Sequence, residues 1–371
     1  MRDMEMTQKK RLLGVLRGES APLAWYADLS WWYESQRIKG TLDPRYGGEE
    51  GYLAFHRDVG AGICFYAPFL WRTTYDSRHE FSVENRGPDQ ICTWKTPRGQ
   101  VRQVSRHLPG SFTWAITEHF VKTLEDLAIL VEIQQYAHHE ENYGAYLEAA
   151  KLWGEDGVAV GLTPLGTEPF QRLVTRWAGI ETTVGLYMED RAEFESMLEL
   201  LREADEPIWR IIEDSPCEVL EMPENFSSEV TGQNFFRRYL MPQYQKLNRR
   251  LHGAKKITGI HNDGTLGSTF GLMGECGFDF VEAVTPSPVG DIAVDGLRAR
   301  AGEEIVVWGG LPGALFSPLF DEDSFERHLR HTVEVFARDG RCVLGVADQV
   351  PPDAVPHRVK RVAEAVNAIY E

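Results

Sequence analysis

The sequence predicts one α/β domain over residues 1–371, a (β/α)8 TIM barrel with a helical and hairpin elaboration in its N-terminal part. Three observations favour this fold. Short apolar runs alternate with amphipathic segments roughly every 35 to 45 residues, as in repeated βα units. Several of these runs stop at His, Asp or Glu, as buried parallel strands do at their C-terminal ends. A doubly wound nucleotide-binding sheet is the alternative, but neither GxGxxG nor GxxxxGK followed by Ser or Thr occurs.

The first half of the chain begins with a predicted helix, from about Gln8 to Arg17, and a strand around Ala21 to Tyr26. Residues 91–104 are typical of a hairpin, because Pro97 suits the second position of its turn and Gly99 the fourth. We expect helices at about 123–137 and 141–153, followed by a strand at 158–162.

The second half repeats the strand and helix pattern. A helix begins near Asp190, and Pro242 should kink or divide another helix at about 233–251. Strands are predicted at 219–222, 256–260, 278–281, 305–308 and 342–346, and further helices at 266–275, 291–300 and 321–338. A last helix has Val359, Val362, Ala363, Val366 and Ile369 on one face.

The composition excludes several classes of protein. The formal net charge of -17 argues against a nucleic-acid partner, because phosphates need a basic surface. No segment approaches the roughly 18 apolar residues of a membrane span, and no apolar core of a signal peptide is present. The five cysteines form no CxxC pair and lie in or beside apolar runs, which indicates reduced thiols. We therefore expect a cytoplasmic protein, with a homodimer as its candidate assembly.

Polar residues follow four of the late strands. Glu224 and Asn225 follow strand 219–222, His261 and Asp263 follow strand 256–260, Glu282 follows strand 278–281, and Asp348 and Gln349 follow the last strand. In a barrel these positions open onto one mouth. They could bind a divalent metal such as zinc, relay protons, or hydrogen-bond a substrate. Asp263 could instead cap the helix that follows it.

Aromatic residues gather at the end of the first strand. Trp25, Tyr26, Trp31 and Trp32 lie within eight residues of one another, with Asp28 among them. Indole faces at a mouth can stack on a planar ring or hold a cation, although packing in the core is an equal alternative. Trp31 and Trp32 cannot both point the same way, so one of them should face the cavity or a partner.

Two further motifs have simpler interpretations. His138-His139-Glu140-Glu141 resembles a metal cluster, but adjacent histidines on a helix point about 100° apart, which favours a solvated helix junction. The run from Gly309 to Gly313 follows a strand and could present backbone amides to an anion, or could form a tight turn.

Beyond these features, the chain resembles the uroporphyrinogen decarboxylase superfamily. The resemblance covers most of the chain and rests on the opening RLLGVLRGESAPLAWY, the hairpin TWKTPRGQV and the segment RRYLMPQYQKL. It continues through HNDG followed by ECGFDFVE, then VVWGGLP, and the closing VLGVADQVPPDAVP. The resemblance implies a (β/α)8 barrel with its site at the C-terminal mouth.

Two departures distinguish this chain within the superfamily. The decarboxylase carries an arginine-bearing segment just after its first strand, whereas no arginine occurs here between Ala27 and Trp32. The thiol methyltransferases carry a His-x-Cys zinc motif with a later Cys. Here Asp263 stands at the place of the first cysteine, and the place of the later one falls near Asp348. The chain is more similar to members that demethylate small methylated compounds.

The resemblance implies a corrinoid-dependent methyltransferase component, which moves a methyl group from a small methylated or methoxylated donor to a separate corrinoid protein. His261, Asp263, Glu282 and Asp348 would be catalytic, and His261 and Asp263 would hold a metal if one is bound. The alternatives are decarboxylation of a smaller carboxylic acid and a non-catalytic, ligand-binding barrel. Substrate contacts are expected from Trp25, Asp28, Trp31, Trp32, Glu224, Asn225 and Gln349.

Overall fold

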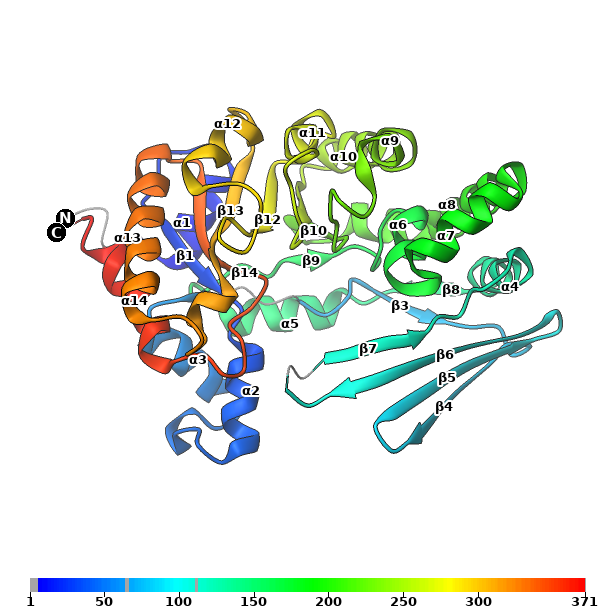
Figure 1. The fold of residues 1–371 in the computed structure, drawn as a ribbon, viewed down its shortest axis with the longest axis horizontal. Helices are drawn as coiled ribbons and strands as arrows, with labels where there is room; N and C mark the ends of the chain where they lie inside the picture. The colour runs from blue at the N-terminus through cyan, green and yellow to red at the C-terminus, as the bar shows by residue number, and fades with distance from the viewer. Residues whose placement is uncertain (1–5, 64–66, 111–112, 371) are drawn as a thin grey trace.

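A computed structural model describes residues 6–63, 67–110 and 113–370 of the chain. Its main element is an eight-stranded parallel sheet, which helices surround (Figure 1). The strand order is β2 (Gly62–Ile63), β1 (Ala24–Ala27), β14 (Cys342–Ala347), β13 (Val306–Pro312), β12 (Phe280–Val284), β11 (Ile257–His261), β10 (Val219–Pro223) and β9 (Gly161–Leu162).

The sheet curls until its two edges approach each other, and the described residues of these edges share little pairing. A single parallel bridge joins Ile63 of β2 to Gly157, just before β9. Two backbone hydrogen bonds accompany it, from Ile63 N to Asp156 O at 2.9 Å and from Ala67 N to Val160 O at 3.0 Å. The fold is therefore barrel-like, as the sequence predicts, and within the described residues β2 and β9 share no continuous ladder.

The helices agree with the predicted alternation, with shifts of a few residues at their ends. The predicted helix at 233–251 is divided, because a π-helical segment, Phe236–Leu240, separates α9 from α10, and Pro242 lies at the start of α10. The helices are α1 (Gln8–Leu16), α2 (Ser30–Lys39), α3 (Gly48–Asp58), α4 (Leu124–Gln135), α5 (Tyr143–Trp153), α6 (Pro169–Arg172), α7 (Gly179–Glu189), α8 (Arg191–Asp214), α9 (Gly232–Phe235), α10 (Met241–Gly253), α11 (Phe270–Glu275), α12 (Leu297–Ala301), α13 (Glu322–Asp339) and α14 (Pro356–Asn367).

The expected hairpin belongs to a larger antiparallel sheet, which projects from the barrel (Figure 1). Its strands are β4 (Glu80–Arg86), β5 (Asp89–Thr96), β6 (Gly99–Leu108) and β7 (Thr113–Glu118), in that order. Thr96 pairs with Gly99, so Pro97 and Arg98 form the two-residue turn of the predicted hairpin.

His138–Glu141 lie between α4 and α5 and are mostly exposed, as a solvated helix junction requires, but their conformation is extended. These residues form strand β8, which pairs antiparallel with β3 (Trp71–Thr74). Successive side chains of a strand point to opposite faces, so the two histidines diverge. His139 Nδ1 lies 3.0 Å from the hydroxyl of Thr73 on the neighbouring strand. The segment therefore serves sheet pairing.

Large aromatic side chains fill the N-terminal end of the barrel interior. Tyr26 and Phe280 each pack against Trp308, with ring centroids 5.7 Å apart in both pairs. Glycine on neighbouring strands makes room for them: a Cβ at Gly259 would lie 2.1 Å from the Phe280 ring. Apolar residues of α1 pack against the same cluster. Side chains farther along these strands therefore stand above an aromatic floor.

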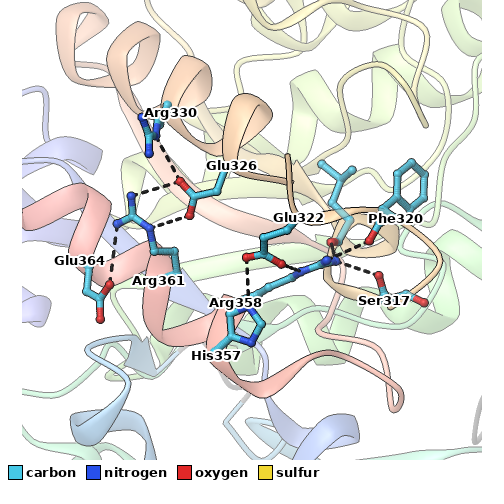
Figure 2. Close-up of polar contacts among 10 residues, drawn as sticks. Ser317, Phe320, Glu322, Glu326, Arg330, His357, Arg358, Arg361 and Glu364 are labelled. Carbon is cyan, nitrogen blue, oxygen red and sulfur yellow. Dashed lines mark hydrogen bonds and ion pairs between the residues drawn. The ribbon is translucent and has the colours of Figure 1, made fainter. Parts of the chain in front are cut away.

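The loop after β13 is held to α14 by one buried arginine, Arg358 (Figure 2). Its guanidinium donates to the carbonyl oxygens of Leu315, Ser317 and Phe320 at 2.7 to 2.9 Å, and to Glu322 at 3.0 Å. Ser317 O also accepts from Phe320 N at 3.2 Å, so the guanidinium adds a second, charged donor at that carbonyl. Arg358 thus fixes a loop whose first residues border the barrel mouth.

None of the described helices is both long and apolar enough to cross a membrane. Cys92, Cys217, Cys276 and Cys342 are free thiols, and Cys64 lies outside the described residues.

Candidate active site

The strand register brings His261 and Glu282 side by side above the aromatic floor. His261 ends β11 and pairs in register with Glu282 of β12. Because strand side chains alternate and Phe280 faces the interior, Glu282 two residues later faces it as well. The predicted strand was expected to stop before Glu282, but β12 runs to Val284, so Glu282 lies within the strand.

His261 and Glu282 form a buried charged pair. Their Nδ1 and Oε2 atoms are 2.5 Å apart, and the side chains are only 8% and 5% exposed. Burial alone would lower the pKa of His261, but the charges of Glu282, Glu221 and Asp263 outweigh it and raise that pKa. The Nδ1–H bond to Glu282 leaves Nε2 as the nitrogen that faces Asp348.

Asp348 lies across the mouth from this pair. Its Oδ1 is 4.0 Å from His261 Nε2, and its side chain is 47% exposed. Withdrawal from water raises the pKa of Asp348 to about 6; His261 opposes that rise, whereas Asp263, Glu282 and Asp28 add to it. Its backbone has φ of 63°, a left-handed conformation that Asp tolerates better than most residues. The turn after β14 therefore points a titratable carboxyl group into the mouth.

A cavity of about 430 Å³ opens above these residues. It is lined by Asp263, Asp348, Gln349 and Trp31. Gly110, two residues after strand β6 of the antiparallel sheet, also lines it. Asp28, at the end of β1, accepts a hydrogen bond from Ser30 N at 2.7 Å, and burial raises its pKa. Asp28 interacts electrostatically with Glu282 and Asp348, so it belongs to the same group of carboxyl groups.

The aromatic cluster divides between core and cavity, as the opposite directions of Trp31 and Trp32 require. Trp31 lines the cavity, whereas Trp32 is buried, stacks on Phe55 with centroids 5.1 Å apart and donates to Ala354 O at 3.0 Å. Trp25 is also buried and packs on the outer face of β1, opposite Tyr26. Trp25 and Trp32 are therefore placed as packing residues, in contrast to the expected substrate contacts.

Glu224 and Asn225 also differ from expectation. Glu224 is fully buried, accepts from Tyr244 Oη at 2.8 Å and from Glu168 N at 3.1 Å, and burial raises its pKa to about 8. Asn225 is exposed with φ of 45°, and neither residue lines the mouth cavity. Both belong to the loop after β10, whereas Glu221, within that strand, lies beside His261.

Two other local interpretations require correction. Asp263 caps no helix, because α11 begins at Phe270 with Thr269 at its N-cap, so Asp263 stays available to the cavity. The glycines at 309 and 310 lie inside β13, with Gly309 against the backbone of Val284, so they allow close packing. Of that run, Gly313 lines the cavity.

Glu221 is a site residue that the strand-end pattern missed. It lies in the middle of β10, is 1% exposed, and its Oε1 is 3.9 Å from His261 Nδ1. The sequence did carry a signal, because a carboxylate inside the apolar run Val-Leu-Glu-Met is costly unless a partner or ligand balances it.

The donor set fits a divalent cation. Glu221, His261 and Glu282 each offer a ligand atom, and these atoms all lie within 4.8 Å of one another. Imidazole and carboxylate oxygens are ligands that zinc accepts. The same arrangement without a metal is a proton-holding pair, with Asp348 as a second proton site.

Comparisons with known proteins identify the fold. No family model matches the chain, and no curated protein matches it in sequence. Among solved structures, the chain is similar to a methyltransferase from Methanosarcina mazei, with a TM-score of 0.62 and 18% sequence identity. The match covers 99% of this chain and 100% of that one. A match at 18% identity shows a shared fold and carries no assignment of activity.

Proposed function

We propose that this chain is the donor-cleaving component of a corrinoid-dependent methyltransferase system. It would take a methyl group from a small methylated or methoxylated donor and transfer it to a corrinoid carried by a separate protein. The observation that carries the proposal is the buried His261–Glu282 pair beneath a cavity that Asp263 and Asp348 line. The likeness in fold to a methyltransferase and the sequence resemblance both agree with it.

The mouth groups have separate roles in this proposal. Glu282 holds the His261 ring through Nδ1, so that Nε2 points toward the cavity and Asp348. When the leaving atom is an oxygen, it must gain a proton or another positive partner, and Asp348 can supply the proton because its pKa lies near neutrality. Trp31 provides an apolar wall against which a small donor can rest.

A divalent metal would be held by His261 together with Glu221, Glu282 and Asp263. When bound, such a metal polarises the donor's heteroatom and stabilises the charge that develops on it. In that case Glu221 and Glu282 would act as ligands in addition to orienting the ring. The proposal places the corrinoid on a separate carrier protein, as the sequence resemblance implies.

The test combines a transfer assay with metal analysis of the purified protein. A panel of methylated and methoxylated donors is incubated anaerobically with the chain and a reduced corrinoid protein. His261→Ala and Asp263→Asn should abolish methyl transfer while changing stability by roughly 1 kcal/mol or less. Unfolding of these variants, or full activity in either, would show that the two residues are structural and would overturn the assigned roles.

A further inference from the structure

The mouth of the barrel is strongly acidic. Five carboxyl groups, those of Asp28, Glu221, Asp263, Glu282 and Asp348, act on one another or on the single imidazole of His261. A protonated His261 balances one of these charges at most. Buried carboxylates that repel one another are costly, so a bound cation would lower the free energy of this arrangement.

No fixed cation in the described residues supplies that balance. The residues that line the mouth cavity include neither Lys nor Arg, and residues 111–112, next to Gly110, are Ser and Phe. Arg37 pairs with Glu34 and lines a different cavity outside the mouth. Lys39 Nζ donates to the carbonyl of Pro352 at 3.3 Å, at the rim. An anionic donor would therefore meet net repulsion.

We infer that the donor of the proposed methyl transfer is a small organic cation, a methylated ammonium or sulfonium, which the carboxylates of this mouth and the face of Trp31 bind. The inference rests on the proposed function for its chemistry and on the cavity for its binding. An indole ring next to carboxylates suits a methylated onium group, because the charge on such a group is spread over its methyl hydrogens. Gln349 also lines the cavity, and its side-chain amide oxygen Oε1 has no hydrogen-bond donor among the described residues.

The chemistry balances without a proton. The bond between the methyl carbon and the nitrogen or sulfur breaks, and both electrons stay on that atom, which becomes a neutral amine or sulfide. The methyl carbon forms its new bond to the cobalt of a reduced corrinoid, which supplies both electrons and is formally oxidised by two. Carboxylates that remain ionised are compatible with this step, whereas an ether donor would need one of them protonated.

The binding test uses choline, the trimethylsulfonium ion, the uncharged carbon isostere of choline, and methoxyacetate as an anion. Calorimetry on the purified full chain should show an onium ion binding at least about tenfold more tightly than the isostere, and methoxyacetate binding most weakly. Asp263→Asn and Trp31→Leu should each weaken onium binding about tenfold. Glu303→Gln removes the same charge from the exposed loop before β13, at the opposite end of the barrel, and should leave binding unchanged.

Equal binding of the onium ions and the isostere, absence of onium binding, or preference for the anion would overturn the inference. Its failure is distinguishable from failure of the proposed function. Methyl transfer from neutral ethers, without binding of onium ions, would contradict the inference and leave the proposed function standing. Onium binding that weakens in Asp263→Asn and Trp31→Leu, without methyl transfer to any corrinoid protein, would support the cation site and contradict the proposed function.

Discussion

The carboxyl group of Asp348 combines a left-handed backbone, a position above His261 and three acidic neighbours. The left-handed backbone and the acidic neighbours cost stability, His261 offsets only part of that cost, and a surface turn would need none of these features. Their coincidence at one residue beside a cavity is what makes Asp348 a functional candidate.

We expect Asp348→Asn to raise the melting temperature near pH 8 and to have little effect near pH 4. The native pKa is raised from 3.8 to about 6, so the folded chain holds a proton that the unfolded chain has already released between these values. Stability conferred by this group is therefore lost as pH rises from about 4 to 6. Asn tolerates the same backbone conformation.

Thermal unfolding of both proteins over this pH range checks the expectation. A variant that is less stable than the parent near pH 8 would mean that the neighbours of Asp348 stabilise its ionised form. Loss of methyl transfer together with this gain in stability would identify a residue kept for function.

Individual site residues differed in how far the sequence could place them. His261, Asp263 and Asp348 follow apolar runs, so their location could be predicted. Trp25 and Trp32 could not be separated from Trp31, because composition does not say which face of a strand or helix meets the cavity. Glu221 was not predicted as a site residue because it lies inside β10, whereas site residues were expected only after the ends of strands.

At the scale of elements, the interior floor depends on glycine as much as on aromatic residues. Gly259→Ala should destabilise the protein by about 1 to 3 kcal/mol, because its Cβ would overlap the ring of Phe280. Denaturant unfolding measures the change. Adding Phe280→Leu should recover part of the loss, and Gly185→Ala, which has open space on α7, should be neutral or stabilising. Additive effects at 259 and 280 would contradict this packing.

The loop after β13 provides a second element-scale test. Arg358→Ala should cost about 3 kcal/mol, because the carbonyl groups of Leu315, Ser317 and Phe320 lose a charged donor and Glu322 loses an ion-pair partner. Arg330→Ala is the matched control: this arginine is 68% exposed and pairs with Glu326, so its loss should cost about 1 kcal/mol at most. Both arginines are visible in Figure 2. Equal losses of unfolding free energy in the two variants would show that the buried contacts of Arg358 stabilise the protein no more than an exposed ion pair does.

Regular elements could be predicted where periodicity is long or turn chemistry is specific. The helix that contains Phe194 and Leu201 and the hairpin turn at Pro97 are examples. The strand at residues 138–141 was not predicted, because four polar residues carry no period and only pairing with β3 makes them a strand. The bridge from Ile63 to Gly157, which joins the two edges of the sheet, is a tertiary contact that periodicity in the sequence cannot predict.

At the scale of the whole molecule, the acidic mouth argues against a polycarboxylate substrate. We expect no useful turnover of uroporphyrinogen, because several carboxylates require several fixed guanidinium groups, and the described lining of the mouth has none. An anaerobic assay beside an authentic decarboxylase measures this. Stepwise loss of carboxylates at a comparable rate would point to Arg37 and Lys39 and would overturn the methyltransferase proposal.

The most direct measurement follows a labelled methyl group from donor to corrinoid. Donors that carry a carbon-13 methyl group are incubated anaerobically with the chain and a reduced corrinoid protein, and the corrinoid is then analysed by mass spectrometry. The account predicts labelled methyl on the corrinoid with the parent chain and none with His261→Ala, although both are folded. Absence of label with every donor, from a chain that binds at least one of them in its mouth, would contradict the central claim.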